Sequence, residues 1–138
     1  MLASLLIPLS LAAPLLVANA SCKGPNPAIT GAELQSRSMS GELNRFVVAV
    51  HVTNVGTKGQ PSNLLQSVEV MQNGDHVGQK GLPPLRPGQS ATVTYAFTRS
   101  AGAAMHTTKL LFVLSQGTYA IPGPEDCNAA NDRIRLSV

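Results

Sequence analysis

Acidic and amide side chains gather near the carboxyl end of the chain, in a segment that also carries Glu125. Such oxygen ligands could hold Ca²⁺, which takes about six to eight oxygens. The spacing lacks the EF-hand pattern, and the same side chains also cap tight turns through the nearby backbone. We therefore expect a capped turn before the last strand, with no resident metal or cofactor. The alternative calcium ligands are Asp126, Asn128, Asn131 and Asp132.

The histidines do not form a recognisable metal motif. His51, His76 and His106 occur in three different segments, with no HxH or HExxH pattern. A zinc site would therefore need ligands that meet only in the folded chain. We expect His51 to face outward from a strand, His76 to follow a hairpin turn and His106 to precede a strand.

Nucleophilic and phosphate-binding chemistry also lacks sequence support. No GxSxG motif is present, and Ser100 and Ser115 are interpreted as turn residues. Gly74, Gly78 and Gly81 lack the strand–loop–helix context of a phosphate-binding loop. The sequence therefore predicts a protein that is not an enzyme.

Two cysteines, Cys22 and Cys127, flank nearly all of the chain that follows the first apolar segment. An even number of cysteines in an exported protein indicates a disulfide. Closing a loop of about 100 residues would stabilise the fold by up to ~4.7 kcal/mol in the chain-entropy model. Two unpaired thiols are the alternative. The absence of a CxxC motif and of nearby histidines argues against a metal site.

The first segment of the chain, Met1–Ala20, has the character of a secretion signal. It is uncharged and contains the apolar run Leu5–Val17, which prolines interrupt. It ends in Ala18-Asn19-Ala20, a small-x-small site that places cleavage before Ser21. We expect a signal peptide over 1–20, a mature domain over 21–138 without an integral membrane segment, and a periplasmic or secreted location.

Two alternatives to cleavage remain open. One is an uncleaved anchor. The other is lipidation at Cys22, although a lipobox has Leu or a similar residue three positions earlier, where this chain has Asn19.

Composition and charge narrow the class of protein further. The chain has 138 residues, 43% of them apolar, with 12 Gly, 10 Pro and no Trp. This is a globular, turn-rich composition that excludes collagen, a coiled coil and a charge-dominated disordered tail. The 10 basic and 7 acidic residues give a net charge of +3, but the basic residues are scattered. A nucleic-acid partner would need a focused basic patch, so we expect none.

The elements that must carry these residues are short strands separated by Gly, Pro and Asn turns. Arg45–Thr53 is the clearest strand, because Phe46, Val48, Val50 and Val52 share one wholly apolar face. The strand ends at Asn54-Val55-Gly56, whose Asn and Gly are interpreted as residues that adopt turn conformations at low cost.

Further turn and edge signals complete the pattern. Asn73-Gly74 predicts a hairpin with a type I′ turn, and Ser38–Glu42 predicts a polar turn. Leu110–Leu114 is a continuous apolar run typical of a central strand. The expected strands are Ala28–Ser36, Arg45–Thr53, Leu64–Gln72, His76–Lys80, Gln89–Thr98, Thr107–Ser115 and Arg133–Val138. The first and fourth are the candidate sheet edges.

About seven short strands in one domain indicate an all-β fold, an immunoglobulin-like antiparallel β-sandwich. The hallmark tryptophan is missing, and the cysteines lie near the ends of the domain. A fibronectin-type-III-like variant is therefore expected in place of an antibody-type domain.

Four stretches together resemble the CARDB domain, a cell-adhesion-related domain found in bacteria. They are Val50–Gly56, Val68–Gly78, Leu85–Val93 and Asp126–Asp132. Their order and spacing extend the resemblance over about Ala28–Val138. The last stretch departs from the family pattern, because Asp126-Cys127 stands where the family has an acidic residue before its first Asn.

The resemblance implies an exported or surface-attached β-sandwich module that is not catalytic. We expect it to bind a protein or glycan partner in adhesion at the bacterial envelope, although the sequence does not identify the binding residues. The alternatives are a structural spacer or accessory subunit of an envelope assembly and, third, a small metal-binding protein or enzyme.

Overall fold

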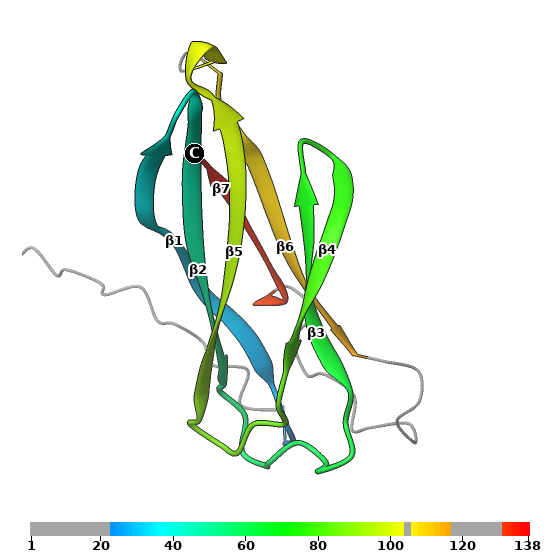
Figure 1. Cartoon of the computed structure of the whole chain (residues 1–138). Coiled ribbons are helices and arrows are strands. Elements are labelled where there is room, and N and C mark those ends of the chain that lie inside the picture. The colour runs from blue at the N-terminus through cyan, green and yellow to red at the C-terminus, as the bar shows by residue number, and fades with distance from the viewer. Residues whose placement is uncertain (1–22, 104–105, 117–130) are drawn as a thin grey trace, which may run out of the picture.

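The fold is known from a computed structural model, which describes residues 23–103, 106–116 and 131–138. Within these residues, antiparallel strands form a three-stranded sheet of order β1-β2-β5 and a four-stranded sheet of order β4-β3-β6-β7 (Figure 1). The predicted all-β, immunoglobulin-like sandwich is confirmed. The elements are β1 (Pro27–Ser40), β2 (Leu43–Asn54), β3 (Gln66–Gln72), β4 (Asp75–Leu82), β5 (Ser90–Ser100), the 3-10 turn η1 (Ala101–Ala103), β6 (Lys109–Gln116) and β7 (Arg133–Ser137).

The core lies between the two sheets, and β2 supplies its largest share. The four apolar side chains predicted to share one face, Phe46, Val48, Val50 and Val52, are all buried. They alternate with side chains on the outer surface because successive residues of a strand point to opposite sides of the sheet. The pairing of β2 with β5 has no register shift, so this alternation is kept along the whole strand.

The four-stranded sheet closes the core from the other side. Val68 and Val70 of β3 and Leu110 and Phe112 of β6 are buried there. The ring of Phe112 lies edge-on to that of Tyr95 of the opposite sheet, with centroids 6.5 Å apart. Aromatic and β-branched side chains thus interdigitate across the sandwich, which holds the two sheets face to face.

The hairpin between β3 and β4 has the predicted type I′ turn. Asn73 and Gly74 have φ values of 50° and 89°, the left-handed conformation that this turn requires at both central residues. Gln72 and Asp75 close the ladder on either side. The Asn-Gly pair therefore fixes the register of this hairpin.

The first strand is longer than predicted. β1 stays paired with β2 as far as Ser40 opposite Leu43, so the expected turn over Ser38–Glu42 shrinks to Gly41-Glu42. The far half of β1 is exposed and carries no apolar alternation. Its backbone pairs with β2, and the Arg37 guanidinium lies 5.5 Å from the centroid of the Phe46 ring. β1 and β4 are sheet edges, as predicted.

Arg99 of β5 connects the two sheets at one end of the sandwich. Its guanidinium lies 4.7 Å from the centroid of the Phe46 ring, and its Nη1 donates to Thr108 Oγ1 at 3.0 Å and to the carbonyl of Val138 at 2.8 Å. The arginine thus links the three-stranded sheet to the segments that flank β6 and β7. This contact was not predicted from the sequence.

The last strand, β7, has one apolar and one basic side. Ile134 and Leu136 point toward the core, and Arg133 and Arg135 point outward. The apolar pair is only half-buried, because β7 is an edge strand with a neighbour on one side only. In the part of the chain that the structure describes, no helix is long and apolar enough to cross a membrane.

Candidate functional site

The predicted calcium cluster falls partly within the described residues. Asn131 Nδ2 donates to Asn26 Oδ1 at 3.3 Å, and the Asp132 carbonyl accepts a hydrogen bond from the Leu114 amide at 2.7 Å. Among residues 23–103, 106–116 and 131–138, no three His, Cys, Asp or Glu side chains are grouped so that they could hold a metal ion. The other predicted site residues lie outside the described residues: Cys22, Glu125, Asp126, Cys127 and Asn128.

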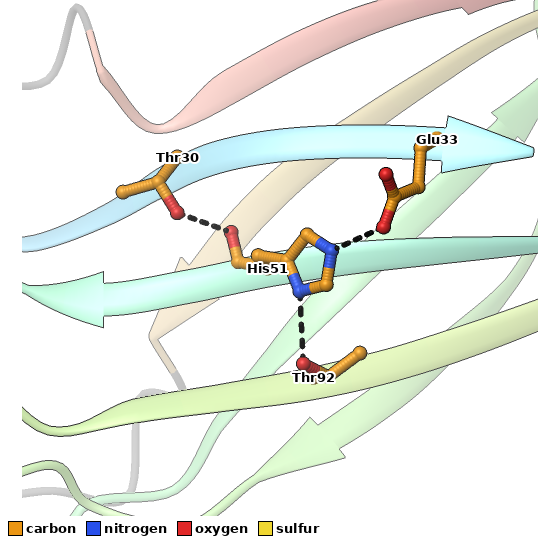
Figure 2. A network of polar contacts seen from close by, with 4 residues as sticks. All are labelled: Thr30, Glu33, His51 and Thr92. Carbon is orange, nitrogen blue, oxygen red and sulfur yellow. Dashed lines mark hydrogen bonds and ion pairs between the residues drawn. The ribbon is translucent and has the colours of Figure 1, made fainter. Parts of the chain in front are cut away.

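His51 is the centre of a polar network on the outer face of the three-stranded sheet (Figure 2). Its Nδ1 lies 2.9 Å from Thr92 Oγ1, and its Nε2 lies 2.9 Å from Glu33 Oε1. The hydroxyl of Thr30 donates to the His51 carbonyl at 3.3 Å. The imidazole therefore bridges β1, β2 and β5 across the sheet.

This network has the composition of a catalytic triad, because a hydroxyl, an imidazole and a carboxylate are linked one after another by hydrogen bonds. A hydrolytic triad also needs hydrogen-bond donors that stabilise an oxyanion beside the nucleophile. Thr92 lies near the start of β5, exposed on the outer face of the sheet. We interpret the network as a cross-strand tie.

Replacing His51 with alanine tests this interpretation. Exposed cross-strand pairs contribute little, so the expected loss of unfolding free energy is about 0.5 kcal/mol. Chemical denaturation followed by circular dichroism measures it, with Thr94→Ala on the same face as the matched control. A loss above about 2 kcal/mol would contradict an exposed tie, because losses of that size come from buried groups.

The other two histidines lie apart from His51. His76 of β4 forms an ion pair with Glu69 across the β3–β4 hairpin, and His106 is exposed before β6. The three imidazoles do not come together, as the separate segments predict. Their positions after a turn and before a strand are confirmed.

A different surface has the character of a binding site: the outward side of β3, β6 and β7. Leu111 of β6 lies directly opposite Met71 on β3 and Arg135 on β7. Val113 is likewise flanked by Arg133 on β7. Directly opposed residues share one side of a sheet, so these side chains form one surface. We call it the outer β6 face, made of Met71, Lys109, Leu111, Val113, Arg133 and Arg135.

The outer β6 face is apolar in its middle and hollowed at one end. Met71, Leu111 and Val113 are half-buried, although they point away from the core. A cavity of about 700 Å³ lies where Met71 and Leu111 meet Lys109 and Arg135, next to the Asn73-Gly74 turn. Ligand pockets have volumes of about 300–1,000 Å³ and apolar linings with a few polar groups. The cavity has both properties.

Positive charge borders the apolar middle on one side. Lys109, Arg133 and Arg135 are exposed, and no carboxylate of the described residues lies within ion-pair distance of them. Glu69 lies on the same side of the sheet, opposite Val113, but on the far side from β7 and paired with His76. Arg133 and Arg135 therefore form a basic flank along β7, and Lys109 adds a positive charge at the start of β6.

The sequence contains a pattern that indicates this surface. The run Leu110–Leu114 was interpreted as a central strand, yet a strand with one solvent-facing side must display its alternate apolar residues outward. Leu111 and Val113 are those residues, and Arg133 and Arg135 alternate in the same way on the last strand. Which strand lies beside β6 could not be read from the sequence.

Comparison with known proteins gives the class of fold. No protein-family model and no curated protein matches the sequence. Among solved structures, the chain is similar to a CARDB domain from Pyrococcus furiosus in complex with di-metal ions, with 18% identity, a TM-score of 0.59 and coverage of 83% of this chain and 86% of that one. The fold is thus that of a CARDB domain, and the resemblance noted in the sequence is confirmed at the level of fold.

A second similarity shows the same architecture inside a larger protein. A candidate beta-galactosidase from Bacteroides fragilis shares 15% identity with a TM-score of 0.51, over 81% of this chain. The match spans only 17% of that protein. The likeness concerns the sandwich alone.

Proposed function

We propose that the chain is an exported, non-catalytic binding module that docks a protein or glycan partner on the outer β6 face, in an adhesion-related role. One observation carries the proposal: apolar side chains that the core does not use, Met71, Leu111 and Val113, lie together on a solvent-facing sheet surface beside a cavity. Burying such side chains against a partner gains free energy that they do not gain in the isolated domain.

The opposite outer face is a poorer candidate. Thr92, Thr94 and Thr98 line its β5 side, and they are exposed, small and polar. Its central feature, the His51 network, already satisfies its own polar atoms. The β5 side of that surface is therefore polar.

The CARDB-like fold supports the adhesion-related role and the location outside the cytosol. The Pyrococcus furiosus domain is described with di-metal ions. In the described residues of this chain, no three His, Cys, Asp or Glu side chains are grouped so that they could hold a metal ion. The Cys22–Cys127 disulfide belongs to the same proposal, since export exposes the chain to oxidising conditions.

A structural spacer is the second candidate, and the chain path favours it. The first described residues are anchored beside Thr57, whose Oγ1 accepts from the Gly24 amide, whereas Val138 pairs with Thr108 toward the other end of the sandwich (Figure 1). A domain whose first and last described residues lie at opposite ends of the sandwich has the geometry of a spacer. A spacer needs no partner on a sheet face.

Site-specific photo-crosslinking separates the two candidates. With a photoreactive phenylalanine at Val113, we expect a discrete adduct to a partner in the native envelope. The same group at Thr94, on the opposite outer face, is the matched control and should give none. Equal labelling at both positions, or no adduct at Val113 with the exported protein present, would contradict docking on the outer β6 face.

A further inference from the structure

We infer that the outer β6 face binds an extended peptide segment with acidic side chains at alternate positions and apolar side chains between them. The inference rests on the proposed function and gives the chemistry of its partner. It follows from how the charges and the apolar side chains are arranged on neighbouring strands.

The spacing of the basic flank matches an extended chain. Arg133 and Arg135 are two residues apart on the outward side of β7, which separates them by about 6.6 Å along the strand. An extended peptide repeats its side-chain directions with the same period. Two acidic residues at positions i and i+2 of a peptide that runs along β7 can therefore meet both guanidiniums at once.

The apolar residues in the middle of the face contact the apolar side chains of the peptide. In an extended segment whose acidic side chains point toward β7, the alternate side chains point the other way. There they reach Leu111 and Val113 of β6 and Met71 of β3, which lie opposite one another in the sheet. The cavity beside Met71 and Leu111 can take one apolar side chain of the peptide.

Electrostatics set the orientation of the peptide. On the β3 side of the apolar middle lies Glu69, paired with His76. On the β7 side lie Arg133 and Arg135, which form no ion pair with a carboxylate of the described residues. A peptide with acidic residues on both flanks would meet Glu69 with like charge. The surface therefore favours a segment that is acidic on one side only.

A membrane surface fits the same face less well. Insertion into a bilayer requires protruding apolar side chains, whereas Met71, Leu111 and Val113 are half-buried between their neighbours. The exposed large apolar side chains of the described residues all lie elsewhere: Leu34, Met39, Leu43, Val55, Leu65 and Val77. A shallow apolar surface with a basic rim suits a peptide that lies on it.

Fluorescence anisotropy with a defined probe tests the inference. The probe is a fluorescein-labelled octapeptide in which glutamate alternates with leucine, and its comparison peptides carry glutamine or lysine in place of glutamate. The protein is the full mature chain as wild type, as the double variant R133E/R135E, and as R45E, a charge reversal on the exposed outer side of β2. Circular dichroism and melting curves confirm that each variant is folded.

We expect the acidic peptide to bind the wild type and R45E alike, and R133E/R135E about tenfold more weakly. Raising the ionic strength should weaken binding to the wild type. Equal binding of the acidic peptide to wild type and R133E/R135E would overturn the inference.

Failure of the inference differs from failure of the proposed function. If the glutamine or lysine peptide binds and the acidic one does not, the partner chemistry is wrong although docking on the face stands. If only vesicles containing phosphatidylglycerol bind, and R133E/R135E loses that binding, the inference is overturned in favour of a membrane surface. If no probe binds while the Val113 crosslink still forms, the acidic peptide is excluded and the docking face is retained.

Discussion

Replacing Asn54 with alanine is expected to lower the free energy of unfolding by about 3–4 kcal/mol, a large fraction of the stability of a domain of this size. Asn54 is fully buried at the end of β2. Its side chain is a hydrogen-bond partner of four backbone groups at this end of the sandwich, so the loss is far larger than that of one exposed hydrogen bond.

All four hydrogen-bonding positions of the Asn54 amide are used. Its Oδ1 accepts from the amides of Asn26 and Gly56 at 3.0 and 2.9 Å. Its Nδ2 donates to the carbonyls of Lys58 and Leu85 at 2.9 and 3.0 Å. Alanine would remove this partner from four backbone groups. The Leu85 carbonyl would keep its hydrogen bond from the Gln60 amide at 3.0 Å, and each of the other groups left unsatisfied would cost about 1–3 kcal/mol. Partial relaxation and entry of water reduce the sum.

Urea denaturation followed by circular dichroism measures this loss. Two further substitutions serve as comparisons. Asn54→Asp keeps the shape but directs a second oxygen at the carbonyls of Lys58 and Leu85, so a loss at least as large as that of alanine is expected. Asn63→Ala removes an exposed asparagine and should change the stability by less than about 0.5 kcal/mol. A loss below about 1 kcal/mol for Asn54→Ala would refute the role of this side chain as the link between the segments.

The same motif shows where sequence reasoning ends. Asn54-Val55-Gly56 was interpreted as residues that adopt turn conformations easily. Gly56 is required for a different reason. A Cβ there would lie 2.2 Å from the carbonyl oxygen of Gly24, so the backbone of residues 24–26, which precedes β1, can lie this close to position 56 only when that residue is glycine. The position of the turn and its residue types could be predicted from the sequence. The close contact between Gly56 and Gly24 could not, because it joins segments far apart in the sequence.

Local patterns predicted most of the fold, because a strand with one buried face must alternate along its own length. The face of β2 and the Asn73-Gly74 turn are such local features, and both are confirmed. The far half of β1 was missed because its exposed side chains do not alternate between apolar and polar, although its backbone pairs with β2.

The candidate site was hidden for a related reason. Leu111 and Arg135 are each ordinary within their own strands, and they become a surface only when β6 and β7 lie side by side. Strand neighbours depend on topology, which the sequence pattern did not give. The histidines, in contrast, lie apart in the structure, as their separation in the sequence suggested.

Replacing Phe112 with alanine is expected to destabilise the protein by about 3–5 kcal/mol. Phe112 is fully buried in the middle of β6, and its ring packs edge-on against Tyr95 of the opposite sheet. Burial raises the pKa of the Tyr95 hydroxyl, which donates to Gln72 Oε1 at 2.6 Å. Loss of the phenyl ring would therefore leave a cavity next to a side chain that is held at both ends and cannot move to fill it.

The next residue of the strand provides the matched control for Phe112. Val113→Ala changes a half-buried side chain on the outer β6 face, and a loss of about 1 kcal/mol or less is expected. Phe112→Leu keeps much of the volume and should lose less than Phe112→Ala. Thermal and urea unfolding of the three variants measure the contrast between the two sides of one strand. Equal losses for Phe112→Ala and Val113→Ala would mean that β6 is buried on both sides, and the outer β6 face could not then be a docking surface.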